Sequence, residues 1–303
     1  MRILLIGGSG SLGSNLLVLN PGHDLYPAYQ THEIRHPLAL HLDITERDRV
    51  CEVMEALRPH VVIHAGGMTK PAACERDPET TWRVNVQGTT HLVDAATQIG
   101  ARFILLSTDL VFDHSTQPRQ EESQPRPISV YGQSKVAAER EVMQRSRDFA
   151  IVRISLLYGW SARYSSSFAE WVLDELRAGR PCPLFADQWR NMTYIPDLAA
   201  ALFELAERRE PLNGILHIAG PALCSRYDLG RELATTFSLP LELAQKAAMR
   251  GQPLAGYTPE CVALDTTRMK QVLHTHIRAM PDGVRAMKAL EEQGYRARFD
   301  PHF

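Results

Sequence analysis

A glycine-rich turn close to the N-terminus is the feature that constrains this chain most. Arg2–Ile6 reads RILLI, a continuous apolar run typical of a buried strand, and a helix is predicted over Ser11–Leu19. Glycines at 7, 10 and 13 lie where strand passes into helix; they permit a tight turn, a backbone approach to pyrophosphate, and close helix–strand packing. We therefore expect a dinucleotide site formed by Gly7, Ser9, Gly10, Ser11, Leu12 and Gly13.

Short apolar runs alternate with amphipathic stretches through the rest of the first half. Strands are predicted at 24–28, 61–64, 103–106 and 150–154, and helices at 46–57 (capped by Thr45), 78–98 and 130–145. Strands that alternate with helices form right-handed βαβ units, and continuously apolar strands are covered on both faces. The fold class predicted is α/β: a Rossmann-type doubly wound parallel sheet with a smaller C-terminal substrate lobe.

The regular alternation of predicted strands and helices becomes less clear after about residue 155, which suggests a second lobe. Residues 1–155 should form an NAD(P)-binding Rossmann domain, with 192–220 returning to its sheet through strands at 192–195 and 215–218 that flank a helix at 196–208. Residues 156–191 and 221–303 then form the substrate-binding lobe, with helices at 165–178 and 226–237. The loop Asp113–Pro127 is expected on the surface. Ligands of open α/β sheets bind at the carboxyl edge, so a cleft between the lobes is the expected site.

The composition of the chain indicates which classes of binding partner to expect. The chain has 303 residues, 44% hydrophobic and 22% charged, with a formal net charge of −2, so no basic field favours nucleic acid. No stretch approaches the roughly 20 apolar residues of a membrane span. None of the five cysteines forms a C-x-x-C pair, and we predict no metal site. We expect a cytoplasmic protein with a small-molecule substrate and with no nucleic-acid or membrane partner. Formation of a homodimer is left open.

Tyr131 and Lys135 stand four residues apart in the helix predicted over 130–145, so they share a helix face. A phenol is a poor proton donor or acceptor at neutral pH, and a neighbouring ammonium is expected to lower its pKa. Alone, such a pair could be an exposed helix pair with no role. Thr108 and Asp109, however, follow a predicted strand at the same sheet edge, where a hydroxyl could hold a substrate carbonyl.

The sequence resembles extended short-chain dehydrogenases/reductases, and within them the dTDP-4-dehydrorhamnose reductase group. The resemblance covers nearly the whole chain and rests on GGSGSLG, STDLVFD (107–113), YGQSK (131–135), VRI…LYG (152–159), DQ (187–188), PDLA (196–199) and LDT (264–266). It implies catalytic roles for Thr108, Tyr131 and Lys135.

The resemblance also implies further cofactor contacts. Asp43 and Ile44 match residues beside the adenine, although Asp43 could instead cap a helix, and His64, Ala65 and Gly66 match a small-residue stretch along the cofactor. Asn85 either lies behind the site or is a plain helix residue. The second strand has no acid at its tip, and His32, Arg35 and His36 could meet a 2′-phosphate. NADP(H) is therefore favoured, with NAD(H) as the alternative.

Two departures bear on the substrate. The group's Asp-Lys pair is lost from Thr69–Glu75, and Thr258 stands where an Arg is usual. We expect dTDP-4-dehydrorhamnose to be a poor substrate at best. Arg190 is the candidate cation for the substrate and Trp189 could stack on it; the alternative is a surface Arg190 paired with Asp187 and a core Trp189.

Three functions remain open at this point. The first is an NAD(P)H-dependent reductase of a keto group, on a nucleotide-activated deoxysugar. The second is a cofactor-binding regulatory subunit, because the chain also resembles the regulatory β subunit of methionine adenosyltransferase. The third is a sugar-nucleotide epimerase or dehydratase, although the Glu that dehydratases carry after the aspartate is replaced here by Leu110.

Overall fold

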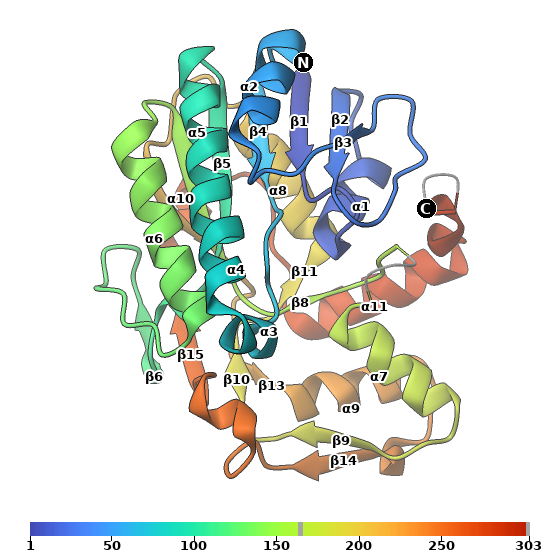
Figure 1. Cartoon of the computed structure of the whole chain (residues 1–303). Helices are drawn as coiled ribbons and strands as arrows, with labels where there is room; N and C mark the ends of the chain where they lie inside the picture. The colour runs from blue at the N-terminus through green and yellow to red at the C-terminus, as the bar shows by residue number, and fades with distance from the viewer. Residues whose placement is uncertain (163–165, 301–303) are drawn as a thin grey trace.

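A computed structural model describes residues 1–162 and 166–300, and within them the elements form three layers around a parallel sheet of seven strands (Figure 1). In spatial order the strands are β12 (Gly214–Ile218), β7 (Phe149–Ile154), β5 (Arg102–Thr108), β4 (Val61–His64), β1 (Arg2–Ile6), β2 (Asp24–Tyr29) and β3 (Leu40–His41). Strand β1 pairs with β2 on one side and β4 on the other, so the strand order reverses there. Such a switch point is where open parallel sheets bind ligands.

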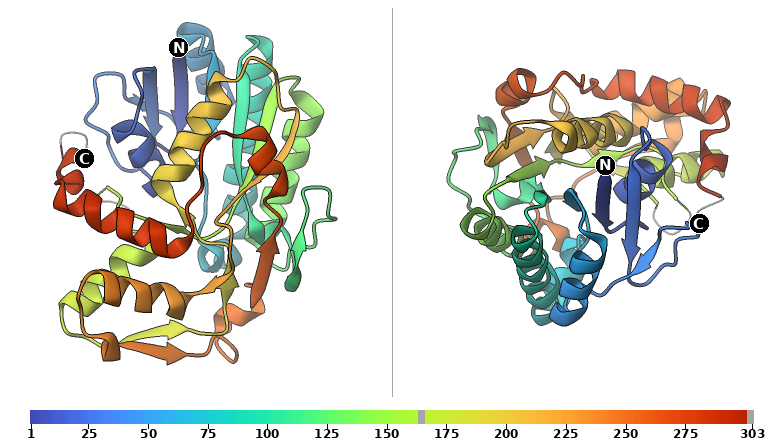
Figure 2. Two further views of the ribbon diagram at one scale, coloured as in Figure 1. Left: turned by 180° about the vertical axis from the view of Figure 1, so that it is seen from behind. Right: turned by 90° about the horizontal axis from the view of Figure 1, so that it is seen from above.

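Helices cover both faces of the main sheet (Figures 1 and 2). One face carries α2 (Arg47–Leu57), α5 (Gly88–Gln98) and α6 (Val130–Arg145); the other carries α1 (Ser11–Val18) and α8 (Ile195–Glu207), with α10 (Thr267–Val272) against β12. Helix α11 (Met280–Glu292) packs against α9 (Arg226–Thr236). The apolar run of β1 serves both faces: Ile3 and Leu5 belong to one core cluster, and Leu4 and Ile6 to the other. Successive strand residues point to opposite faces, which explains the unbroken apolar pattern.

The predicted fold class is confirmed, and α6 has the predicted bounds. Three local predictions differ. Thr45 does not cap α2, which begins at Arg47; its amide and hydroxyl donate to the Asp43 carboxylate instead. The helix predicted over 78–98 is divided into α4 (Pro78–Trp82), a π-helical turn (Arg83–Gln87) and α5. Strand β11 (Thr193–Tyr194) pairs with β8 (Leu157–Tyr158) outside the main sheet, whereas β12 joins that sheet beside β7.

A smaller lobe lies below the carboxyl ends of the main strands in Figure 1. It contains α7 (Phe168–Arg177), α9 (Arg226–Thr236), the parallel pair β9 (Cys182–Phe185) and β14 (Ala244–Ala247), and a sheet in the order β13 (Cys224–Ser225), β10 (Trp189–Arg190), β15 (Cys261–Leu264) and β6 (Ser115–Arg119). The loop predicted over 113–127 thus contains a strand, which pairs with β15. The predicted start of α7 at Ser165 lies outside the described residues, as do the other residues of 163–165 and 301–303.

The C-terminal part of the chain returns to the first helix. After α11, a short 3₁₀ turn (Tyr295–Arg298) packs beside α1 (Figure 2). The Tyr295 hydroxyl donates to Asn15 Oδ1 at 2.9 Å, and the Asn15 amide donates to the Trp160 carbonyl at 2.8 Å. Asn15 is fully buried, so these hydrogen bonds satisfy a polar group that would otherwise be costly to bury. The helix that follows the glycine turn is therefore fixed by residues from the other end of the chain.

No helix in the described ranges combines the length and apolar character required to cross a membrane. Within the same ranges, His, Cys, Asp and Glu side chains do not gather in threes or more as a metal site.

Candidate active site

The glycine turn is shaped by close contacts that exclude side chains. Gly7 has φ +83°, and a Cβ there would lie 2.7 Å from the Gly66 Cα at the end of β4. A Cβ on Gly13 would lie 2.2 Å from the Gly7 carbonyl oxygen. The two roles expected from the sequence, a tight turn and close packing against the helix start, thus have a steric basis. At Gly10 a Cβ would meet the Gly7 oxygen at 3.4 Å, a contact that leaves the backbone accessible from the cavity side.

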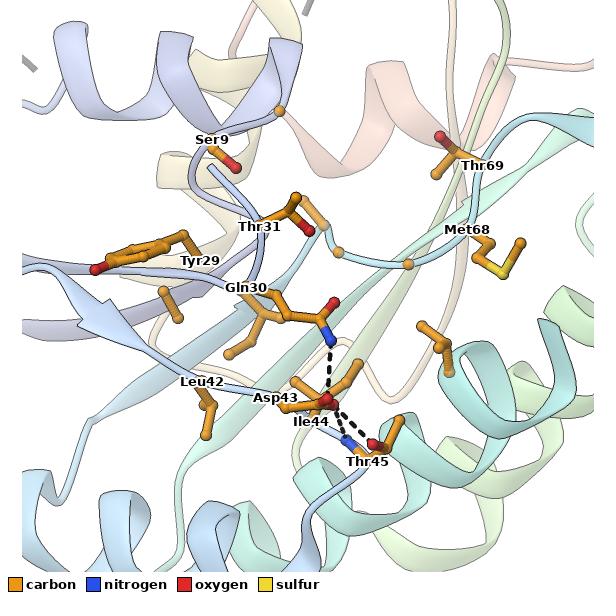
Figure 3. A pocket seen from close by; sticks show the side chains of 18 of the residues that line it. Ser9, Tyr29, Gln30, Thr31, Leu42, Asp43, Ile44, Thr45, Met68 and Thr69 are labelled. Atoms are coloured by element: carbon orange, nitrogen blue, oxygen red, sulfur yellow. Dashed lines mark hydrogen bonds between the residues drawn. The ribbon is translucent and has the colours of Figure 1, made fainter. Parts of the chain in front are cut away.

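A cavity of about 440 Å³ opens beside this turn at the switch point (Figure 3). It brings together most of the residues predicted for the cofactor: Gly7, Ser9, Gly10, Asp43, Ile44, Ala65 and Gly66. It also has residues that the sequence did not single out: Tyr29, Gln30, Thr31, Thr45, Met68, Thr69, Thr80 and Arg83. We refer to it as the cofactor cavity.

The end of β2 faces this cavity without a carboxylate. Gln30 follows the strand and donates to Asp43 Oδ2 at 2.8 Å, while Thr45 occupies Asp43 Oδ1 (Figure 3). Burial opposes the charge on Asp43, but these hydrogen bonds hold the pKa of its carboxyl below the usual range. Asp43 is therefore an anchored anion on the cavity wall and not the N-cap of α2. Of the three cations expected near a 2′-phosphate, His32 lines the cavity, whereas Arg35 and His36 do not.

His64 does not line the cofactor cavity. It is 1% exposed at the end of β4, and its Nε2 lies 3.0 Å from Thr89 Oγ1 on α5. The Thr89 hydroxyl donates to the Asn85 carbonyl, so His64 Nε2 must be the donor to Thr89. Burial and the nearby Lys135 lower the pKa of His64 to about 3, which keeps the ring neutral. The neighbouring Ala65 and Gly66 face the cavity as predicted.

A second cavity of about 270 Å³ continues from the first, with Gly7, Gly10, Ala65, Gly66 and Thr69 lining both. It adds the remaining residues predicted from the glycine turn, Ser11, Leu12 and Gly13, and it adds Tyr131 and Lys135 of α6. A third cavity of about 440 Å³ shares Ser11, Thr69 and Tyr131 with the second and extends to the smaller lobe. We call this third space the substrate cavity. The three cavities form one path from the tip of β2, past Tyr131, to the lobe.

Thr108, Tyr131 and Lys135 lie together where the second and third cavities meet. Tyr131 hydrogen-bonds to Thr108, the last residue of β5. Thr108 Oγ1 accepts from the Leu110 amide and donates to Asp109 Oδ1, both at 3.1 Å. All three predicted catalytic side chains are at most 8% exposed. A carbonyl placed here would meet a phenol and a threonine hydroxyl in a nearly dry environment.

The expected pKa of Tyr131 requires a correction. Burial raises the pKa of the Tyr131 phenol above its usual value, despite the hydrogen bond with Thr108, and Asp109 raises it further. Burial also lowers the pKa of Lys135 to about 8, although the Glu139 carboxylate opposes that change. The sequence pattern suggested a phenol activated by the ammonium; desolvation is the larger effect in the protein alone. Tyr131 is therefore a protonated phenol at neutral pH.

Helix α6 is held in place by buried polar contacts. Asn85, in the π-helical turn, donates to Ser134 Oγ and binds both the amide and the carbonyl of Met68 at 2.8–3.0 Å. π-Helical turns are frequent at functional sites, and this one aims an amide at the loop that lines the cofactor cavity. Of the two interpretations of Asn85, the structure supports the one that places it behind the site.

A buried ion pair fixes the same helix further along. Arg153 of β7 donates to Glu139 through Nε at 2.9 Å and Nη2 at 2.7 Å, and Ser107 Oγ donates to the same carboxylate at 2.5 Å. Both charged side chains are 2% exposed. Glu139 is one helical turn beyond Lys135, so this bidentate pair joins α6 to the centre of the sheet.

Arg190 lines the substrate cavity but is not a surface residue. It is 4% exposed, and its Nη atoms donate to the carbonyls of Trp189, Pro259 and Glu260 at 2.7–3.2 Å. Its Nε lies 3.3 Å from Asp109 Oδ2. The alternative pairing with Asp187 is wrong, because the Asp187 carboxylate accepts the backbone amides of residues 249 and 250.

The structure does not bring Trp189 to the substrate cavity. Trp189 and Arg190 are neighbours in β10, so their side chains point to opposite faces, and Trp189 is 39% exposed. Two residues that the sequence analysis did not assign to the substrate, Gln188 and Arg226, also line the cavity, together with Lys70 and Thr258. Arg226 was predicted only as the start of a helix; it lines the same cavity as Thr108 at the end of β5.

Comparisons with known proteins show the family of this chain. The family model described as "RmlD substrate binding domain" matches residues 1–292. The chain is 30% identical over 247 residues to methionine adenosyltransferase 2 subunit beta from Xenopus tropicalis, covering 79% of this chain and 73% of that protein. It is 29% identical to the probable low-salt glycan biosynthesis reductase Agl14 from Haloferax volcanii, over 95% of this chain and 98% of that one.

A solved structure shows that the fold is shared with known proteins. The crystal structure of dTDP-4-dehydrorhamnose reductase from Bacillus anthracis in complex with NADP superposes with a TM-score of 0.82 at 23% identity, covering 95% of this chain and 98% of that one.

Proposed function

This chain belongs to the RmlD substrate binding domain family, and we propose that it is an NAD(P)H-dependent reductase of the extended short-chain dehydrogenase/reductase type that reduces a keto group on a nucleotide-activated sugar. The observation that carries the proposal is the path of three cavities: the glycine turn lies at one end, Thr108, Tyr131 and Lys135 lie in the middle, and a cavity lined by arginines lies at the other. The reductase Agl14, similar over nearly the full length of both chains, supports it.

The residues present fit a nicotinamide dinucleotide. The close approach of Gly7 to Gly66, and the accessible backbone at Gly10, form a cradle that a side chain would fill. When bound, the nicotinamide supplies the hydride that adds to the carbonyl carbon. Tyr131 donates its proton to the carbonyl oxygen, and Thr108 orients that oxygen by hydrogen bonding. The Lys135 ammonium stabilises the phenolate that Tyr131 becomes.

The raised pKa of Tyr131 suits this direction of reaction. A reductase needs the phenol protonated before hydride transfer, and burial keeps it so at neutral pH. The proton then leaves Tyr131 only as negative charge develops on the substrate oxygen.

We further propose that NADPH binds at least as well as NADH. An NAD-selective site has an Asp or Glu at the tip of the second strand to bond the ribose 2′-hydroxyl. Here Gln30 and Thr31 stand at that tip, and both Asp43 oxygens are occupied by protein donors. Calorimetry should give a dissociation constant for NADPH no larger than that for NADH. A Thr31→Asp variant should then favour NADH, while the neutral Thr31→Asn should not; a strong preference of wild type for NADH would contradict the proposal.

Turnover is the direct test of the function. Purified protein with NADPH is mixed with a panel of keto sugar nucleotides, and the loss of absorbance at the reduced nicotinamide band is followed. We expect at least one substrate, with dTDP-4-dehydrorhamnose poor at best because Thr258 stands where an Arg is usual in the group it resembles. Efficient turnover of dTDP-4-dehydrorhamnose would contradict that part of the proposal.

A cofactor-binding regulatory role is the second candidate, favoured by the 30% identity to methionine adenosyltransferase 2 subunit beta. It predicts that no keto sugar nucleotide is turned over and that the protein is recovered with a partner enzyme in pull-downs. Catalytic turnover that depends on Tyr131 would exclude this as the whole function.

A further inference from the structure

The substrate cavity carries more positive than negative charge. Arg190, Arg226 and Lys70 line it, and Asp109 is the acidic residue among its described lining. Asp109 is already engaged: its Oδ2 accepts from Ser155 Oγ at 2.8 Å and lies 3.3 Å from Arg190 Nε. One carboxylate cannot balance these cations, so a group that enters the cavity meets a positive field.

Arg226 lines this cavity without an acidic partner among the described residues. Its Nε donates to Gln188 Oε1, and its guanidinium lies over the Phe168 ring at 4.4 Å from the centroid. Among the described residues, no carboxylate lies within 4.0 Å of it and no hydrogen bond uses its Nη atoms. Arg226 begins α9 directly after Ser225, whose capping box with Asp228 fixes that helix start. The guanidinium is thus held in one orientation while its two-nitrogen edge stays available.

A second polar group in the same cavity also has no partner. Thr258 is 6% exposed, and its Oγ1 is buried without a hydrogen bond from any described residue. Buried hydroxyls are nearly always hydrogen-bonded, so an unpaired one at a cavity wall indicates a ligand or water that completes it. Gln188 is 1% exposed, and its Oε1 accepts the hydrogen bond from Arg226 Nε.

We propose that Arg226, with Arg190 and Thr258, forms a recognition site for an oxyanion group of the substrate, a phosphate or a carboxylate, next to the reacting carbonyl. The position follows from contacts: Arg190 touches Asp109, and Asp109 accepts from Thr108, the residue that orients the carbonyl. Guanidinium edges bind phosphate and carboxylate through two parallel hydrogen bonds, a geometry that a lysine cannot reproduce. The inference rests on the proposed function only in assigning this anion to the substrate.

The electrostatics of the cavity agree with the geometry. Burial and the charge of Arg190 lower the pKa of Arg226 to about 10. A bound oxyanion would favour the charged form of Arg226 and so oppose both effects, because its negative charge offsets the repulsion between the arginines.

Binding of two simple probes to the NADP⁺-saturated protein tests the site without requiring turnover. Inorganic pyrophosphate represents a diphosphate and D-glucuronate represents a sugar carboxylate; each is titrated by calorimetry. We expect at least one probe to bind wild type, and Arg226→Gln to weaken that binding at least tenfold. Arg231→Gln, on the exposed side of the same helix, is the matched control and should leave it unchanged. NADP⁺ affinity and melting temperature should stay close to wild type in both variants.

The outcomes separate the sources of the anion. Tighter pyrophosphate binding assigns the site to a diphosphate, and tighter glucuronate binding assigns it to an acidic sugar. Binding of neither probe, or equal binding by wild type and Arg226→Gln, overturns the proposal. If the proposed reductase function were wrong but the site correct, probe binding would survive while no keto sugar was turned over, so the two failures are distinguishable.

Discussion

The pH dependence of catalysis should report the buried ammonium of Lys135. Burial lowers the pKa of Lys135 from 10.5 to about 8, against the opposing charge of Glu139. The charged form needed to stabilise the Tyr131 phenolate is then about 90% populated at pH 7 and about 10% at pH 9. We expect kcat/KM for NADPH to fall about tenfold between these two pH values, because kcat/KM reports groups in the free enzyme.

The sign of the stability effect separates this loss from unfolding. A lysine with a depressed folded-state pKa destabilises the fold while the ammonium is buried, at pH below about 8, and that cost is relieved as pH rises through 8 towards 10.5. Titration of Lys135 alone therefore stabilises the folded state over the range in which activity is lost. The raised pKa of Tyr131 places phenol ionisation above this range as well.

The assay is initial rates of NADPH oxidation with a saturating keto substrate from pH 6 to 10 at constant ionic strength, with circular dichroism at each pH. Lys135→Arg is the informative variant, because a guanidinium stays charged throughout; its residual activity should lack the decline near pH 8. If wild-type kcat/KM stayed constant up to pH 9.5, or if Lys135→Arg showed the same decline, the decline in activity could not be assigned to Lys135.

Three further substitutions test separate parts of the structure. Tyr131→Phe should reduce kcat by at least about a hundredfold while leaving the NADPH dissociation constant within about twofold, because the ring packing stays and only the proton donor goes; wild-type kcat in this variant would count against the mechanism. Gly13→Ala should weaken NADPH binding at least tenfold, since its Cβ would lie 2.2 Å from the Gly7 oxygen, whereas Gly256→Ala, with nothing within 4 Å, should bind normally in the same calorimetry. Arg153→Met leaves the Glu139 carboxylate buried without its partner and should lower the free energy of unfolding in urea by about 3–5 kcal/mol, with partial recovery on adding Glu139→Gln; a loss below about 1 kcal/mol would mean that the pair is not needed.

Local sequence patterns were sufficient for the elements that build the main sheet. The apolar runs of β1 and β4 could be read directly, because strands buried on both faces leave short-range signals, and the ends of α6 also agreed with the prediction. The glycines of the turn were informative in part for the same reason, because Gly13 makes its close contacts within the turn, whereas Gly7 makes its own with Gly66, which follows β4.

Long-range contacts account for what the sequence did not indicate. Strand β6 contains Pro118 and has no alternating pattern; it is an edge strand that exists because β15 pairs with it from far along the chain. The burial of Arg190 depends on carbonyls of Pro259 and Glu260 that the fold brings to it.

The pKa of Tyr131 was misjudged for a related reason. Spacing reveals that Lys135 is near, but not how completely both side chains are desolvated.

The hydrogen bond between Tyr295 and Asn15 joins residues 280 positions apart, and this has a consequence for the order of synthesis. A ribosome that has just released β1 and α1 has made the glycine turn, yet the partner that completes the buried Asn15 amide does not exist until Tyr295, 280 positions after Asn15, has been translated. A nascent chain stalled before Tyr295 should therefore protect α1 from protease less well than the finished protein does. A frameshift or premature stop before Tyr295 would therefore remove a contact of the helix that follows the glycine turn.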